Sequence, residues 1–271
     1  GSGASAQGTI NFVAPPQFSM VFNPSSTTNN DSAQVTYTIN NVQNPNPATG
    51  LNFSHNFNAG LEVYQTPNAS TTCVGGTLFA NAGAGSISYV GGSVPASSSC
   101  TINLLVGSEE AGTFIETTGD LSSGFGNSGT ASGTLTVTDV IAPRIRTIER
   151  ANPSSGSTDA DILTWRIRFT EAMDIATFTA DQFVLTALGG GLTADLTIVN
   201  ADATQVEVRA SGGNLPDFNG LVTLGLNSPS SIADLAGNVL VSFNPTEMRQ
   251  DTFELINDST PPMVTAFERY T

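Results

Sequence analysis

Short runs in which apolar and polar residues alternate recur along this chain and restrict what it can fold into. A period of two places successive side chains on opposite faces of a strand. Turn-forming clusters such as Asn44-Pro45-Asn46-Pro47 and Gly91-Gly92 separate the runs, and only 174–181 could hold one helical turn. The sequence therefore predicts an all-β fold of sandwiches with short strands. The clearest alternating runs are 18–22, 34–40, 100–104, 133–138, 163–169, 205–209 and 221–226.

The run at 163–169 carries the only tryptophan of the chain. Leu163, Trp165, Ile167 and Phe169 fall on one face of this predicted strand, and polar residues fall on the other. We therefore expect Trp165 to anchor the core of the second half of the chain.

An internal repeat marks the ends of the domains. Residues 138–151 and 257–270 align so that Asp139 matches Asp258, Pro143 matches Pro262 and Glu149-Arg150 matches Glu268-Arg269. Each copy directly follows an alternating strand, so each is interpreted as a linker followed by the first strand of a new domain. We therefore expect tandem β-sandwich domains, two of them complete. The expected parts are a tag-like leading segment (1–13), two domains (14–138 and 139–257), and a linker with the first strand of a third domain (258–271).

The charge balance excludes several classes of partner. The chain has 23 acidic and 8 basic residues, a formal net charge of -15 and no lysine, and its first arginine is Arg144. A nucleic-acid partner is not expected, because few cations could neutralise a row of phosphates. No apolar run approaches the roughly 18 residues of a membrane helix, so direct membrane insertion is not expected. The missing lysine also excludes a Lys–Asn isopeptide cross-link.

The two cysteines, Cys73 and Cys100, both lie in the first half of the chain. In a Ser-, Thr- and Gly-rich chain without cytosolic character, a disulfide between them is favoured. Two buried free thiols are the alternative. A structural metal site is disfavoured, because the only histidine, His55, cannot complete a four-ligand set with them.

Catalysis is not expected. A Ser or Cys nucleophile needs an activating base, and His55 stands between Ser54 and Asn56 without a recognisable nucleophile turn. We expect this histidine to lie at the surface or to cap a turn.

Five stretches of the first half together carry a family resemblance. They are Phe18 to Pro24, 36–41 (Thr-Tyr-Thr-Ile-Asn-Asn), 70–76 (Ser-Thr-Thr-Cys-Val-Gly-Gly), 97–102 (Ser-Ser-Ser-Cys-Thr-Ile) and 126–131 (Gly-Asn-Ser-Gly-Thr-Ala). Through them, 14–138 resembles a repeat unit of bacterial secreted and surface proteins. The resemblance implies an immunoglobulin-like fold with a Cys73–Cys100 bridge and no known catalysis.

Residues 139–257 resemble bacterial immunoglobulin-like adhesin repeats. This looser resemblance rests on Phe169-Thr170-Glu171-Ala172, on 234–238 (Asp-Leu-Ala-Gly-Asn) and on the Asp-to-Pro linkers. It implies that the linkers could bind calcium, as related linkers often do.

Calcium is the one cofactor that the residues suggest, since it takes six to eight oxygen ligands from carboxylates, amides and carbonyls. The same side chains also suit turns without metal, and that alternative stays open. The candidate ligands are Asp139 and Asp258 in the linkers, Asp159 and Asp161 before the Trp165 strand, and Asp234 and Asn238 in a Gly-containing loop.

Together these features predict a structural or adhesive module of an extracellular protein, secreted or held at the bacterial cell surface. It would act as a spacer or as a fibre-forming tandem repeat without catalysis. The alternative is a ligand-binding domain pair of an adhesin that recognises carbohydrate or protein. The expected partners are neighbouring domains of the same parent chain and a host or cell-surface ligand.

Overall fold

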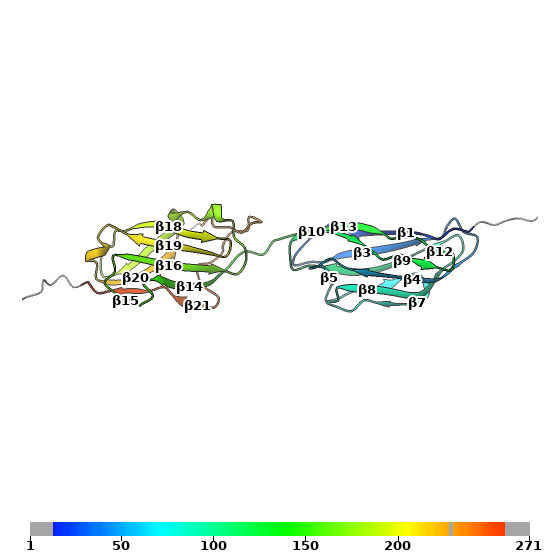
Figure 1. Cartoon of the computed structure of the whole chain (residues 1–271), viewed down its shortest axis with the longest axis horizontal. Coiled ribbons are helices and arrows are strands. Elements are labelled where there is room, and N and C mark those ends of the chain that lie inside the picture. The colour runs from blue at the N-terminus through cyan, green and yellow to red at the C-terminus, as the bar shows by residue number, and fades with distance from the viewer. Residues whose placement is uncertain (1–12, 228–229, 258–271) are drawn as a thin grey trace, which may run out of the picture. The chain divides into compact units, whose positions relative to one another are not determined.

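The computed structural model describes residues 13–227 and 230–257 (Figure 1). The chain divides into two compact units, Gly1–Val140 and Ile141–Thr271. Within the described residues both units consist of β-strands, and the helical content is limited to short 3-10 turns. The all-β prediction is confirmed, whereas the predicted first strand of a third domain, at 258–271, lies outside the described residues.

The described part of the first unit contains three hydrogen-bonded sheets. The first follows the order β1-β3-β9-β5, with β6 also paired to β9: β1 (Gln17–Asn23), β3 (Ala33–Asn40), β9 (Ser99–Gly107), β5 (Glu62–Val63) and β6 (Ser70–Thr71). The second is β10 (Gly112–Thr117), β13 (Ser132–Thr138) and β2 (Ser26–Thr28). The third is β12 (Gly126–Asn127), β11 (Ser122–Ser123), β4 (Ala48–Asn56), β8 (Ser86–Val94) and β7 (Val74–Phe79).

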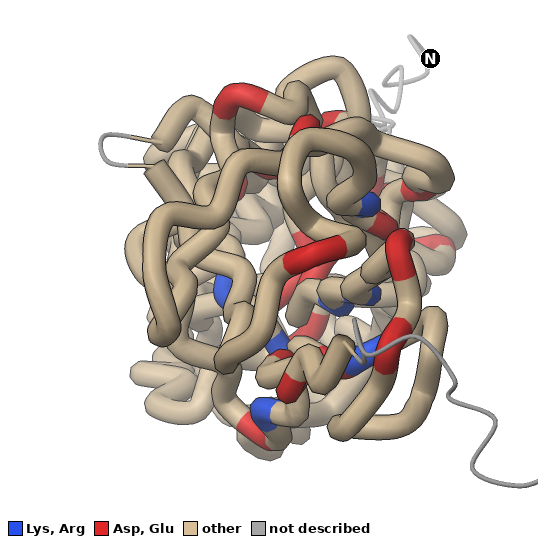
Figure 2. Tube along the Cα trace, turned by 90° about the vertical axis from the view of Figure 1, so that its left-hand side faces the viewer, with Lys and Arg blue, Asp and Glu red and all other residues tan. Residues whose placement is uncertain are grey.

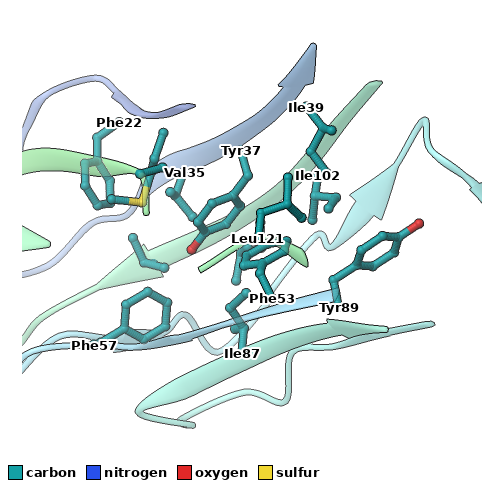
Figure 3. Packing of buried hydrophobic residues seen from close by; sticks show 14 of the residues in the cluster. Phe22, Val35, Tyr37, Ile39, Phe53, Phe57, Ile87, Tyr89, Ile102 and Leu121 are labelled. Atoms are coloured by element: carbon teal, nitrogen blue, oxygen red, sulfur yellow. The ribbon is translucent and has the colours of Figure 1, made fainter. Parts of the chain in front are cut away.

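Side chains from these sheets meet in one core (Figure 3). The Tyr37 ring of β3 lies 5.1 Å from that of Phe53 on β4, and Phe53 lies 6.4 Å from Tyr89 on β8. Burial alternates strictly along β3, as the sequence pattern predicts for a strand with one face against the core. The contacts between β3 and β4 join the two layers of a sandwich.

Two glycines make room for Tyr89 between β7 and β8. The Tyr89 hydroxyl donates a hydrogen bond of 2.8 Å to the carbonyl oxygen of Gly75. A Cβ atom at Gly76 or at Gly92 would overlap the phenol group of Tyr89. Gly76 also has a φ of 80°, in the left-handed region that favours glycine.

The second unit contains two sheets that enclose a separate core. One follows the order β18 (Asp195–Asp202), β19 (Gln205–Ser211), β16 (Ile162–Phe169), β14 (Ile145–Asn152) and β21 (Met248–Gln250). The other follows the order β15 (Ser157–Thr158), β22 (Phe253–Leu255), β20 (Gly220–Leu226) and β17 (Phe183–Leu188). Three 3-10 turns lie outside the sheets: η1 (Ile175–Thr177), η2 (Ala180–Gln182) and η3 (Leu215–Asp217).

Trp165 is fully buried in this second core, as the sequence predicts. Its ring meets that of Phe253, on the opposite sheet, edge to face at a centroid distance of 5.2 Å. Its indole N–H donates to the carbonyl oxygen of Asp251 at 2.5 Å, so the buried polar atom is paired. Trp165 therefore joins the two layers of the second unit.

The first strand of each unit changes sheets at the same four-residue sequence. Asn23-Pro24-Ser25-Ser26 runs from the last residue of β1 to the first of β2, and Asn152-Pro153-Ser154-Ser155 runs from the last residue of β14 toward β15. The Asn-Pro bond is cis in both places. Each unit thus begins with a strand in two pieces, one in each of two sheets.

Candidate functional site

The first and last strands of the first unit lie next to each other and run parallel. β2 pairs with β13 through Ser26–Thr136 to Thr28–Thr138. The Thr136 N–H donates to the Ser25 carbonyl at 3.0 Å, and the Asn29 N–H donates to the Thr138 carbonyl at 3.0 Å. The end of the last strand is therefore hydrogen-bonded to the beginning of the unit.

The Asn29 side chain extends this pairing beyond the strand. Its Nδ2 donates to Asp139 Oδ1 at 2.7 Å, and its Oδ1 accepts from the Val140 N–H at 3.3 Å. A single amide side chain thus holds the two residues that follow β13.

The second unit repeats the arrangement with two pairs of strands. β14 pairs in parallel with β21, and β15 pairs in parallel with β22. The Glu247 N–H donates to the Arg146 carbonyl at 3.0 Å, and the Ile256 N–H donates to the Thr158 carbonyl at 3.0 Å. We call β2 with β13, and β14–β15 with β21–β22, the terminal clamp of each unit. Sequence reasoning missed the clamps, although the repeated Asn-Pro-Ser-Ser could have indicated where the first strands divide.

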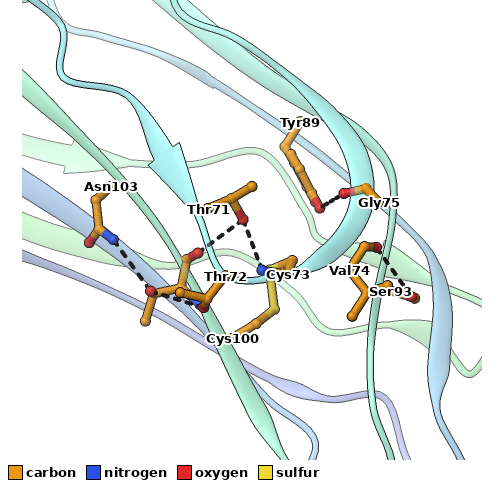
Figure 4. Close-up of a disulfide and its surroundings, with 10 residues drawn as sticks. Thr71, Thr72, Cys73, Val74, Gly75, Tyr89, Ser93, Cys100 and Asn103 are labelled. Atoms are coloured by element: carbon orange, nitrogen blue, oxygen red, sulfur yellow. Dashed lines mark hydrogen bonds between the residues drawn. A yellow bond between two sulfur atoms is a disulfide. The ribbon is translucent and has the colours of Figure 1, made fainter.

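The structure joins Cys73 and Cys100 in a disulfide with a Cα–Cα distance of 4.9 Å (Figure 4). Cys100 lies on β9, and Cys73 lies between β6 and β7. Because β6 pairs with β9 and β7 pairs with β8, this segment crosses from one sheet to another. The disulfide therefore attaches the crossover to β9. The Thr71 hydroxyl accepts from the Cys73 N–H at 3.0 Å and further fixes the segment.

His55 corrects one expectation from the sequence, because it is fully buried rather than exposed or capping. Its Nδ1 lies 2.8 Å from the Tyr37 hydroxyl, and its Nε2 lies 3.0 Å from Glu116 Oε2. The Asn58 N–H also donates to Glu116 Oε1 at 3.2 Å. The sequence alone did not indicate that His55 and Glu116 would be hydrogen-bonded, since they are 61 positions apart.

Burial, and secondly the negative charge of Glu116, raises the pKa of Tyr37 above its ordinary value. The Tyr37 hydroxyl therefore keeps its proton and can donate to His55 Nδ1, which leaves Nε2 to donate to the Glu116 carboxylate. The three side chains form a continuous hydrogen-bonded chain inside the core. In the described part of the unit, the ring nitrogens of His55 are hydrogen-bonded to Tyr37 and Glu116 and to no Ser or Cys side chain.

Two of the predicted calcium ligands meet in the loop 234–238. Asp234 is buried and accepts from the N–H groups of Ala236 and Asn238 at 2.8 and 2.9 Å, and from Asn238 Nδ2 at 2.9 Å. Its carboxylate also lies within 4.8 Å of that of Glu171, which was not among the predicted ligands. The loop thus shows the turn that Asp and Asn form without metal, with a second carboxylate beside it.

Two of the other predicted ligands, Asp159 and Asp161, lie far from this loop within the second unit. Asp159 and Asp161 are exposed before β16, whereas Asp234 bridges to Met173 beyond the far end of that strand, so the length of β16, about 26 Å, separates them. Asp139 belongs to the first unit, and Asp258 lies outside the described residues. Calcium binding by any of these residues stays a prediction.

If calcium binds at the Asp234 loop, millimolar calcium should raise the melting temperature of the second unit relative to chelator. Binding to the folded form adds about 2.7 kcal/mol at a hundredfold excess over Kd. The fluorescence of Trp165 reports on this unit alone. The shift should disappear in Glu171→Gln and persist in Asp159→Asn, an exposed carboxylate of the same unit. An unchanged transition in the unmodified chain would show that the loop is a turn only.

Acidic side chains outnumber the arginines around the chain (Figure 2). On the outer face of β16, Arg166 pairs with Glu207 at 2.6 Å and Arg168 pairs with Glu149 at 3.0 Å. The hydrogen bond that Arg166 donates to Glu207 raises the pKa of Arg166 above its ordinary value. These arginines are matched by carboxylates on the same surface, so they form an ion-pair network rather than a basic patch.

Within the described residues, no helix has the length and apolar character needed to span a bilayer.

Residues 16–137 match a family model described as a domain of unknown function, DUF7933. This match covers most of the first unit, and its description leaves the function open. No curated protein matches the chain.

Several solved structures are similar to the chain at low identity. One is invasin, a bacterial integrin-binding protein, with 10% identity over 90% of this chain and 41% of that chain and a TM-score of 0.36. The Yersinia pseudotuberculosis adhesin InvE shows 14% identity over 76% and 54%, with a TM-score of 0.26. BcpA, the major pilin subunit of Bacillus cereus, shows 7% identity over 88% and 70%, with a TM-score of 0.35. The chain spans less than two thirds of the invasin and InvE chains.

Proposed function

We propose that the chain is a structural and adhesive module of a bacterial extracellular surface protein. Its tandem sandwiches would space a binding activity from the cell or form part of a fibre. Its partners would be neighbouring domains of the same parent chain and a host or cell-surface ligand. The observation that supports this proposal is the terminal clamp, which both units have. The Cys73–Cys100 disulfide also suits an oxidising extracellular location.

The clamp geometry suits a chain under tension. When the two ends of the chain are pulled apart, the force reaches β2 at Ser26 and β13 at Thr138. These residues lie at opposite ends of the paired segment because the strands are parallel. The hydrogen bonds of the clamp are then loaded together in shear and must break together. Bonds worth about 1 kcal/mol each would resist little if they opened one after another.

Single-molecule stretching of the full chain from its two ends tests this role. Asn29→Ala removes both side-chain bonds to residues 139–140 and should lower the unfolding force of the first unit. Asn58→Ala is the matched control, because it removes an exposed amide bond to the Ile115 carbonyl of β10 and no bond between β13 and the β2–Asn29 segment. Both variants should lower equilibrium stability by about 1 kcal/mol, whereas only the first should change the force.

The disulfide identifies which event belongs to the first unit. The disulfide prevents the 27-residue segment between the cysteines from extending. Reduction releases this segment and should increase the extension gained when the first unit unfolds by about 90 Å. If Asn29→Ala and Asn58→Ala unfold at the same force, the clamp does not resist tension and the mechanical proposal is contradicted.

A further inference from the structure

One aromatic ring in the described residues is largely exposed. Phe79, at the end of edge strand β7, is 55% exposed, whereas the other described Phe, Tyr and Trp side chains are buried or half-buried. It pairs with Ser88 on β8, which pairs in turn with Ser54 on β4. These three residues therefore form a row across the outer face of the third sheet, about 10 Å long.

An open hollow of about 270 Å³ lies on this face beside Phe79. Its polar lining consists of hydroxyl and amide side chains only, and no charged residue contributes to it. The Ser86–Asn56 pair forms the next row, and Asn81 follows β7. The residues that line it are Ser54, Asn56, Phe79, Asn81, Ala84, Ile87, Ser86 and Ser88.

In the described structure, the polar side chains of this hollow do not stabilise the fold through hydrogen bonds. In the described structure, those of Asn56, Asn81 and Ser88 make no hydrogen bond within the protein, nor do those of Ser54 and Ser86. Other asparagines of the same unit are used: both Asn41 and Asn44 bond across loops through their side-chain amides. The hollow thus offers unpaired donors and acceptors around one apolar ring.

We propose that this hollow binds a neutral carbohydrate. The exposed ring can pack against the C–H face of a sugar, and the Ser and Asn groups can donate to and accept from its hydroxyls. An anionic glycan or a phosphate would find no cation, because the first unit has no Lys or Arg. A cationic ligand would find no carboxylate in the lining. The remaining chemistry is that of an uncharged polyol.

This inference is independent of the mechanical role, since the outer face of β4, β8 and β7 takes no part in the terminal clamp. Loss of sugar binding would leave the unfolding force unchanged, and loss of clamp strength would leave sugar binding unchanged. The two proposals can therefore fail separately.

The test is amide NMR of the full chain titrated with neutral oligosaccharides: maltoheptaose, mannotriose, galactobiose and tri-N-acetylglucosamine. A heparin tetrasaccharide is the anionic comparison. At least one neutral sugar should shift the amides of 54–56 and 79–88. Phe79→Ala should weaken that binding about tenfold or more, and Asn81→Ala should weaken it several-fold. Val74→Ala is the matched control, because Val74 is a 58% exposed apolar residue at the other end of β7.

Because Phe79 is exposed, its replacement should leave the fold intact, which unchanged shifts in the core strands would confirm. The proposal is overturned if no neutral sugar shifts this face. It is also overturned if Phe79→Ala binds as well as the unmodified chain, or if heparin alone binds there. Concentration-dependent shifts of β7 without sugar, lost in Phe79→Ala, would instead assign the ring to contact between two copies.

Discussion

Replacing Glu116 with alanine should lower the free energy of unfolding of the first unit by about 3 kcal/mol. The carboxylate is fully buried and accepts hydrogen bonds from His55 Nε2 and from the Asn58 N–H. Without it, His55 Nε2 remains inside the core with no acceptor, the half-buried Asn58 N–H also loses its acceptor, and the removed atoms leave a void. Glu109→Ala removes the same charge from an exposed position and should change stability by less than about 0.5 kcal/mol.

Hydrogen exchange in the full chain measures this cost. The slowest amides of β3 and β9 report the opening of the first unit, and amides of the second unit act as an internal reference. Trp165 fluorescence should stay unchanged, since that residue belongs to the other core.

A double-substitution cycle distinguishes the energy of the His55–Glu116 interaction from general damage to the core. In a His55→Leu background, Glu116→Ala should cost at least about 1 kcal/mol less than in the unmodified chain, because one of the stranded donors is gone. An equal cost in both backgrounds would show that the two side chains do not stabilise each other.

Removing the disulfide by replacing both Cys73 and Cys100 with alanine should cost the first unit about 3–4 kcal/mol. The chain-entropy model gives this range for a loop of 27 residues. The crossover between β6 and β7 also loses its covalent attachment to β9, so we expect the effect to be largest in the amides of β7 and β8.

Reductant provides the control for this prediction. It should lower the stability of the unmodified chain to that of the double variant and leave the variant unchanged. Intact mass after alkylation under denaturing conditions, without reductant, should show no labelled cysteine. Two labelled cysteines in that experiment would contradict the pairing.

The strands were predictable from the sequence because burial of one face imposes a period of two. Alternation at 34–40 and 163–169 identified β3 and β16 to within one residue at either end, and the placement of Trp165 followed from the same pattern. The alternation of apolar and polar residues that identifies these strands is a local pattern, so a single stretch of sequence is enough to find them.

The interior of the first unit could not be predicted in the same way. His55 occupies an inward position of β4, but its neighbours in sequence do not reveal that Tyr37 and Glu116 would supply its partners. The terminal clamps likewise depend on pairing between residues 97 to 110 positions apart in the sequence. Such contacts depend on which strands the topology places side by side. The alternation of apolar and polar residues along one strand does not specify which strands become its neighbours.

The packing of Tyr89 limits the order in which this domain could change its sequence. A side chain at Gly92 or Gly76 would overlap the ring, so either substitution would be damaging while tyrosine is present. A smaller residue at 89 would remove the obstacle at Gly92, at the cost of a void in the core. A Cβ atom at Gly76 would still meet the backbone nitrogen of Gly92. Descendants of this domain can therefore replace Gly92 only by routes in which position 89 changes first. Residues 89 and 92 must change in a fixed order, although Gly92 carries no side chain.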